Sequence, residues 1–173
     1  MPSINYMISQ HAIHPRLEPY ARAYRPKLNK YDHWRVGELV HAMHWIEETV
    51  IDALVVGRSC DEEFASHPGK RTFRELWSDP NIWISFHTDP DPSLYAQAVA
   101  NGQDIAVCYG AFRRGWRMVA ATLIHEFAHV NGIVGTDHSR AEDTLLFCGM
   151  QSLHDETIYG YLQTMPASAV TLV

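Results

Sequence analysis

The chain has few cysteines, and they do not form a metal-binding pattern. Cys60, Cys108 and Cys148 are its three cysteines in 173 residues, and no Cys-x-x-Cys pair occurs. A small, odd number of cysteines argues against a framework of disulfides, and the missing spacing argues against a cysteine-bound zinc site. We therefore expect buried free thiols, with one disulfide left open by the spacing.

An excess of positive charge and long apolar runs are also missing. Lys and Arg number 14 against 20 Asp and Glu, so the net charge is −6 and nothing argues for a nucleic-acid partner. No apolar stretch approaches the roughly 20 residues that span a bilayer. Residues 1–18 contain no basic segment followed by a long apolar one, so we expect no membrane partner and no cleaved signal peptide. The expected location is cytoplasmic, or outside the cell by another export route.

The length and composition are typical of one globular domain. The chain is 46% hydrophobic and 20% charged, and we find no repeat, low-complexity segment or domain boundary. We therefore predict a single domain over residues 1–173, large enough to bury a substantial core. Within it, residues 1–34 contain scattered prolines and predict an irregular N-terminal arm.

The hydrophobic pattern predicts an α+β fold. Apolar residues recur every three or four positions over 34–56, which predicts a helix that ends at Gly57, and the polar stretch 59–69 predicts a loop. The remaining expected elements are a helix at 71–77, a strand at 81–87, a helix at 94–100, a strand at 104–109, a helix at 116–131, and a helix from Arg140 capped by Ser139 and Glu142. This order predicts a small mixed or antiparallel sheet packed against the 116–131 helix and the other helices.

A group of polar residues interrupts the apolar helix predicted at 116–131. From Met118 to Val130 the polar residues are Thr122, His125, Glu126 and His129. Residues four apart share one helix face, so His125 and His129 can hold one metal ion. Glu126 lies about 100° around the helix and can take a proton from a metal-bound water. This His-Glu-x-x-His pattern is typical of zinc hydrolases.

The surroundings of the motif matter, because the chain has eleven histidines. A match is expected by chance in roughly 4% of chains of this composition. However, a helix that is apolar nearly all round is a buried helix. Burying two imidazoles and a carboxylate without partners costs several kcal/mol, and a bound metal would compensate for that cost. The alternative is an internally hydrogen-bonded polar cluster without a metal.

The stretch from about Gly110 to Met150, about a quarter of the chain, resembles the zincin metallopeptidases. The resemblance implies a Zn2+ ion bound by His125 and His129, with Glu126 as the general base that activates a zinc-bound water to hydrolyse a peptide bond. It also implies an edge strand before the active helix, to which an extended peptide or protein substrate adds as a further strand. Residues 104–110 resemble that strand, so we expect a substrate cleft between it and the active helix.

A catalytic zinc takes three protein ligands and keeps one position for water. The metzincin pattern would place the third ligand at Gly135, and the gluzincin pattern favours Glu142. The aspzincin pattern Gly-Thr-x-Asp is partly matched by Gly135 to His138, with histidine at the aspartate position. We predict His138 as the third ligand, with Asp137 and Glu142 as alternatives. Asp137, Glu142 or Asp143 can instead accept a hydrogen bond from a ligand histidine and fix its tautomer.

An oxyanion donor is less directly indicated. The tyrosine of the full aspzincin pattern would fall at Ala141, so we consider Tyr109, Tyr159 and Tyr161, each of which can equally be a packing residue. The overall prediction is a zinc metallopeptidase. The alternatives are a non-catalytic zinc-binding module, or a toxin-like effector whose zincin domain acts on an envelope or host target.

Overall fold

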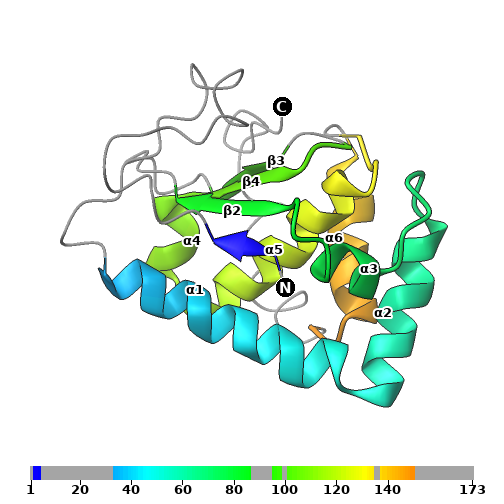
Figure 1. Ribbon diagram of the computed structural model, residues 1–173, viewed down its shortest axis with the longest axis horizontal. Helices are drawn as coiled ribbons and strands as arrows, with labels where there is room; N and C mark the ends of the chain where they lie inside the picture. Colours follow the sequence, from blue (N-terminus) through cyan, green and yellow to red (C-terminus); the bar gives the residue numbers. More distant parts are fainter. Residues whose placement is uncertain (1, 5–32, 87–94, 99–100, 135–136, 151–173) are drawn as a thin grey trace.

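The computed structural model describes residues 2–4, 33–86, 95–98, 101–134 and 137–150, without the side chains of residues 3, 4, 33, 36 and 138. Over these ranges the protein has the predicted α+β fold, with a small mixed sheet and several helices around helix α5, Trp116–Val130 (Figure 1). The irregular arm predicted at 1–34 lies mostly outside these ranges. Among the described residues, no helix is long and apolar enough to cross a bilayer.

The sheet contains four strands in the order β1-β2-β4-β3. They are β1 (Ser3–Ile4), β2 (Trp83–Phe86), β3 (Ala96–Ala98) and β4 (Asp104–Val107). The first three strands of this order run parallel, whereas β3 is antiparallel to β4. All four residues of β4 are buried, as expected for a strand covered on both faces.

Strand β3 corrects two of our predictions. Residues 94–100 were predicted to form a helix, but Ala96–Ala98 pair with β4 from Val107 back to Ile105. This long-range pairing overrides the local helix preference of alanine. The strand predicted at 104–109 exists as β4, but it lies between β2 and β3 and is not the edge strand. In the described sheet the outer strands are β1 and β3.

The first predicted helix is divided into three elements. They are α1 (His33–Ile46), a π-helical turn η3 (Glu47–Ile51) and α2 (Leu54–Ser66). Gly57 therefore does not end a helix, and the loop predicted at 59–69 is wrong up to Ser66. The polar stretch is helical because Cys60 and Phe64, one turn apart, are fully buried while Glu62 between them is exposed.

Three shorter helices complete the described fold: α3 (Phe73–Trp77), α4 (Tyr109–Arg113) and α6 (His138–Phe147). Helix α3 was predicted, and Thr72 and Glu75 form a capping box at its start. The α6 helix begins earlier than predicted. Its N-cap is Asp137, whose side chain accepts a hydrogen bond from the Arg140 amide, so the predicted cap at Ser139 is wrong.

A disulfide joins Cys60 on α2 to Cys148 at the end of α6, across a sequence separation of 88 residues. The expectation of free thiols is therefore wrong for these two cysteines. It is confirmed for Cys108, which is free and buried. The disulfide ties together two helices that pack on each other at one end of the molecule (Figure 1).

Helix α5 lies at the centre of the fold. It runs between the sheet and α1, and it also contacts α4 and α6 (Figure 1). Every residue from Met118 to Val130 is buried, as the apolar pattern predicted. The helix bearing the His-Glu-x-x-His pattern is thus enclosed by the other elements.

Candidate metal centre

The two histidines of α5 converge on one point. The Nε2 atoms of His125 and His129 lie 3.1 Å apart, and the rings meet edge to face. Their residues are only 8% and 1% exposed. The helical spacing of four residues therefore places two ring nitrogens side by side in a buried position.

A main-chain carbonyl determines the tautomer of His129. The Nδ1 atom of this ring lies 2.8 Å from the carbonyl oxygen of Ile133. A carbonyl oxygen only accepts hydrogen bonds, so Nδ1 carries the hydrogen and the neutral ring keeps a lone pair on Nε2. This arrangement is typical of metal-binding histidines, whose second ring nitrogen donates to a backbone carbonyl or carboxylate.

The histidine pair fits a zinc ion. Zinc binds imidazole nitrogen at about 2.0–2.1 Å, so two Nε2 atoms 3.1 Å apart can both reach one ion. Without a metal, one Nε2 atom can donate to the other, which is the internally bonded cluster considered above. The orientation of His129 by Ile133 is compatible with both states.

Glu126, which follows His125 directly in α5, is in a dry position. The residue is 2% exposed, and its Oε2 atom has no hydrogen-bond partner among the described residues. Desolvation by burial raises the pKa of the carboxyl group to about 8, against the opposing effect of a hydrogen bond from the Ala98 amide of β3. A nearby positive charge would favour the carboxylate form.

The candidates for a third ligand all lie at or near the start of α6. His138 is its first helical residue, and its side chain is outside the described part. Asp137 is already used as the N-cap. Glu142 is 7% exposed, and burial, followed by the charge of Asp143, raises its pKa to about 7. Among the described side chains, no three His, Cys, Asp or Glu residues form a group that could hold a metal.

The predicted oxyanion donors are not brought to the pair by the described structure. Tyr109 begins α4, and its ring contacts Trp34 and Arg35 of α1 and Arg113. Tyr159 and Tyr161 lie outside the described residues.

Sequence reasoning missed two main-chain groups at this centre. They are the Ala98 amide, which donates to Glu126, and the Ile133 carbonyl, which accepts from His129. Main-chain groups carry no side-chain signature, so a motif search does not find them. The predicted helix end at Gly132 was the available signal for the position of the Ile133 carbonyl.

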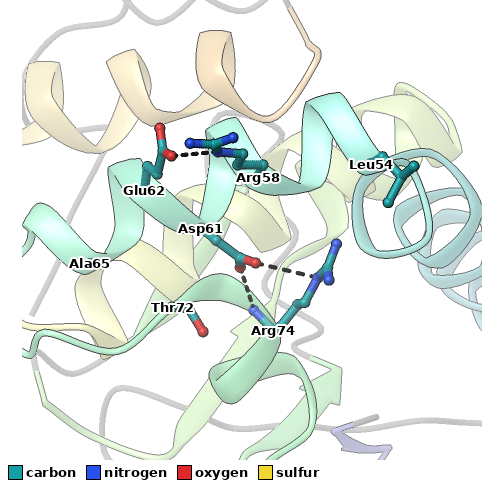
Figure 2. Close-up of a pocket in the computed structure, with 7 residues that line it drawn as sticks. All are labelled: Leu54, Arg58, Asp61, Glu62, Ala65, Thr72 and Arg74. Atoms are coloured by element: carbon teal, nitrogen blue, oxygen red, sulfur yellow. Dashed lines mark hydrogen bonds and ion pairs between the residues drawn. The ribbon is translucent and has the colours of Figure 1, made fainter.

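A separate hollow of about 430 Å³ lies over α2 and the start of α3 (Figure 2). It is lined by Leu54, Arg58, Asp61, Glu62, Ala65, Thr72 and Arg74. Its charges pair within the protein, since Arg58 bonds Glu62 and Asp61 bonds both the backbone and the side chain of Arg74. None of the predicted site residues lines it, so it is distinct from the histidine pair.

Comparisons with known proteins give no independent assignment. No family model, no curated protein and no solved structure matches the chain.

Proposed function

We propose that this protein is a zinc-dependent metallopeptidase whose metal is held by His125, His129 and His138 and whose general base is Glu126. The observation that carries the proposal is the 3.1 Å approach of the two Nε2 atoms beside a buried carboxylate oxygen without a described partner. A packed interior tolerates a carboxylate oxygen without a partner poorly unless something compensates for it. A cation bound by both ring nitrogens would favour the ionised form of Glu126.

The roles of the residues follow from their positions. When bound, zinc supplies a Lewis acid that lowers the pKa of an attacking water and polarises the scissile carbonyl. His125 and His129 hold the ion, and the Ile133 carbonyl keeps the His129 Nε2 lone pair available. The Ala98 amide orients the Glu126 carboxylate, and Oε2 accepts the proton of the water and returns it to the leaving amine.

The substrate strand is proposed at β3. Our sequence expectation placed an added peptide along residues 104–110, but β4 has strands on both sides. Strand β3 is an outer strand of the described sheet, its three residues are buried, and its Ala98 amide donates to Glu126. An extended peptide pairing with β3 would therefore lie close to the proposed general base.

The choice of third ligand is between two positions on one helix face. Asp137 accepts hydrogen bonds from the Ser139 hydroxyl and the Arg140 amide, so its carboxylate is engaged in capping. His138 and Glu142 stand four residues apart in α6, the spacing of positions on one helix face, and the Glu142 residue is buried. We propose His138 as the ligand and Glu142 as a nearby carboxylate that can orient it.

Four proteins test the proposal: wild type, Glu126→Gln, His138→Ala and Glu142→Gln. Zinc content after removal of excess metal is measured by elemental mass spectrometry, and hydrolysis is followed with a quenched-fluorescent peptide library. We expect about one zinc per chain in wild type. Glu126→Gln should keep the zinc and lose roughly 10²–10⁴-fold in activity, the usual contribution of a general base. His138→Ala should lose far more zinc affinity than Glu142→Gln.

Each of these results can contradict the proposal. A wild-type chain that binds no zinc, even after incubation with the metal, makes the histidine pair an internal polar cluster and ends the peptidase assignment. A Glu126→Gln variant as active as wild type removes the proposed base. If Glu142→Gln loses zinc and His138→Ala does not, the third ligand is Glu142 and not His138.

A non-catalytic zinc-binding module is the second candidate, and the burial of the site favours it. His129 and Glu126 are 1% and 2% exposed, which is typical of a closed site. Zinc binding without hydrolysis of any library peptide would support this candidate.

The disulfide bears on location. Disulfides persist in oxidising compartments and are rare in the reducing cytosol. The Cys60–Cys148 bond therefore favours the exported alternative over the cytoplasmic one.

A further inference from the structure

The turn after α5 has a specific hydrogen-bond pattern. The Gly132 amide donates to the His129 carbonyl at 2.8 Å, and the Ile133 amide donates to the Ala128 carbonyl at 3.1 Å. Gly132 has a positive φ of 92°. These two bonds and the left-handed residue define a Schellman motif, a common helix ending that favours glycine.

The same turn determines where the Ile133 carbonyl points. Ile133 directly follows the left-handed glycine, and its oxygen lies 2.8 Å from Nδ1 of His129. If the turn took another path, this oxygen would move away from the ring. The orientation of a candidate metal ligand therefore depends on the backbone conformation of Gly132, three residues away from it.

Neighbouring segments hold the turn in place. The Asn131 side-chain amide donates to the carbonyls of Phe64 and Arg71 at 2.7 and 2.8 Å. The Gly69 amide donates to the Asn131 carbonyl at 2.8 Å. The loop between α2 and α3 is thus bonded to the residue that ends α5, and the turn has little freedom to shift.

There is also little space for a side chain at the left-handed residue. A Cβ atom on Gly132 would lie 2.9 Å from Oδ1 of Asn101 and 3.2 Å from the Gly69 nitrogen. The second of these neighbours is main chain and is itself hydrogen-bonded to Asn131. A substituted residue would therefore both strain the backbone and push the turn away from its anchor.

We propose that Gly132 is a positioning residue for His129. Its left-handed conformation presents the Ile133 carbonyl to Nδ1, which fixes the ring in the Nδ1–H tautomer and directs the Nε2 lone pair to the metal. The proposal deepens the metallopeptidase assignment and rests on it for the metal, whereas the tautomer of His129 can be tested without any metal.

The test compares Gly132→Ala with a matched control at the other end of the same helix. Gly115 is the N-cap of α5 and has a similar positive φ of 89°, but the nearest atom to an added Cβ is Oε2 of Glu38 at 4.0 Å. Gly115→Ala therefore also strains the backbone at α5, because φ 89° with ψ 173° is a region essentially reserved for glycine, but it does so without touching the histidine. Both variants are studied as full chains, with thermal unfolding as the check on folding.

Two quantities are measured. Zinc affinity is obtained by competition with a chelator, and the His129 tautomer is read from imidazole nitrogen chemical shifts of the metal-free protein. We expect Gly132→Ala to lose about 10–100-fold in zinc affinity, as second-shell changes do, and to lose the pure Nδ1–H signature. Gly115→Ala should keep both the affinity and the tautomer of wild type.

The outcomes separate this inference from the proposed function. Equal zinc affinity and an unchanged tautomer in a folded Gly132→Ala overturn the inference and leave the metallopeptidase assignment intact. If wild type binds no zinc, that assignment fails, and the tautomer comparison alone decides the inference. If Gly132→Ala does not fold, the wild-type spectrum decides: an Nε2–H tautomer for metal-free His129 overturns the inference, and an Nδ1–H tautomer supports it.

Discussion

Two buried histidines of this protein are satisfied in different ways. In His129 both ring nitrogens have a partner, Ile133 on one side and His125 on the other. In His67, at the end of α2, Nε2 lies 3.3 Å from both Glu63 and Thr144, while Nδ1 has no partner among the described residues. The Thr144 hydroxyl donates to the Arg140 carbonyl, so it accepts from Nε2–H. These contacts favour the neutral Nε2–H tautomer of His67, whose Nδ1 lies in the core without a partner among the described residues.

This difference predicts a pH-dependent stability that depends on His67. Burial lowers the pKa of His67 from its usual value near 6.5, Glu63 opposes this shift, and the charge of Arg140 adds to it. Because the folded pKa is below the unfolded one, the unfolded chain binds more protons at acidic pH. The stability contribution is full above pH 6.5 and falls below it, by at most about 1.4 kcal/mol per pH unit.

Urea unfolding at pH 7.5 and pH 5.5 measures this contribution. We expect wild type to lose about 1 kcal/mol more between these pH values than His67→Gln, which cannot take up the proton. His44→Gln on the exposed side of α1 is the matched control and should lose as much as wild type. Equal losses in wild type and His67→Gln would show that this ring is not the group that titrates.

At the scale of elements, two glycines in neighbouring helices predict opposite effects of the same substitution. Gly37 lies in α1 with no atom within 4 Å of an added Cβ, so Gly37→Ala should stabilise the protein by about 1 kcal/mol. Gly57 lies in α2, where a Cβ would come within 2.5 Å of the Val50 carbonyl and the Arg74 guanidinium. Gly57→Ala should destabilise the protein by about 1–3 kcal/mol, because α2 must move away from η3.

Denaturant unfolding of the two single variants measures the contrast. A stabilised Gly57→Ala would mean that α2 does not approach the Val50 carbonyl so closely. A destabilised Gly37→Ala would mean that this side of α1 is covered. The expected difference between the two variants is larger than the usual error of such measurements.

The same elements show how far sequence reasoning reaches. The 116–131 helix was predicted nearly to the residue, because its apolar pattern and the terminal Asn131-Gly132 are local signals. Strand β3 was missed because Ala96–Ala98 become a strand only by pairing with β4. The break near Asp52 was also missed, since the apolar spacing continues through η3 and gives no sign of it.

Sequence reasoning about the candidate site extended to side chains and missed the main-chain groups. Helical spacing brings His125 and His129 together, and the role of Glu126 as the base stays a prediction. The Ala98 amide reaches Glu126 only through the sheet, which a linear motif does not encode. The side chain of His138 lies outside the described residues, so its role stays a prediction.

At the scale of the whole molecule, the Cys60–Cys148 bond predicts how stability responds to reduction. Three cysteines allow three pairings, and nothing local in the sequence selects this one. Closing a loop with a sequence separation of 88 residues restricts the unfolded chain. By loop-closure arguments the bond should contribute about 2–5 kcal/mol to the free energy of unfolding.

Thermal unfolding with and without a reductant tests this contribution. Wild type should lose the stabilisation when reduced, and a Cys60→Ala/Cys148→Ala double variant should be insensitive to reductant. Cys108→Ala is the control for a buried free thiol, and it should keep the response of wild type. A wild type that is equally stable in both conditions would contradict the prediction.

The central position of α5 has a consequence for hydrogen exchange. The helix is covered by the sheet, α1, α4 and α6 together, so its amides can meet solvent only when most of these contacts open. Such an element belongs to the last cooperative unit to open in the native state. A ligand held by α5 would stabilise the folded chain against global unfolding. Binding would then slow hydrogen exchange at the slowest-exchanging amides throughout the protein, and not only at amides near the two rings that hold the ligand.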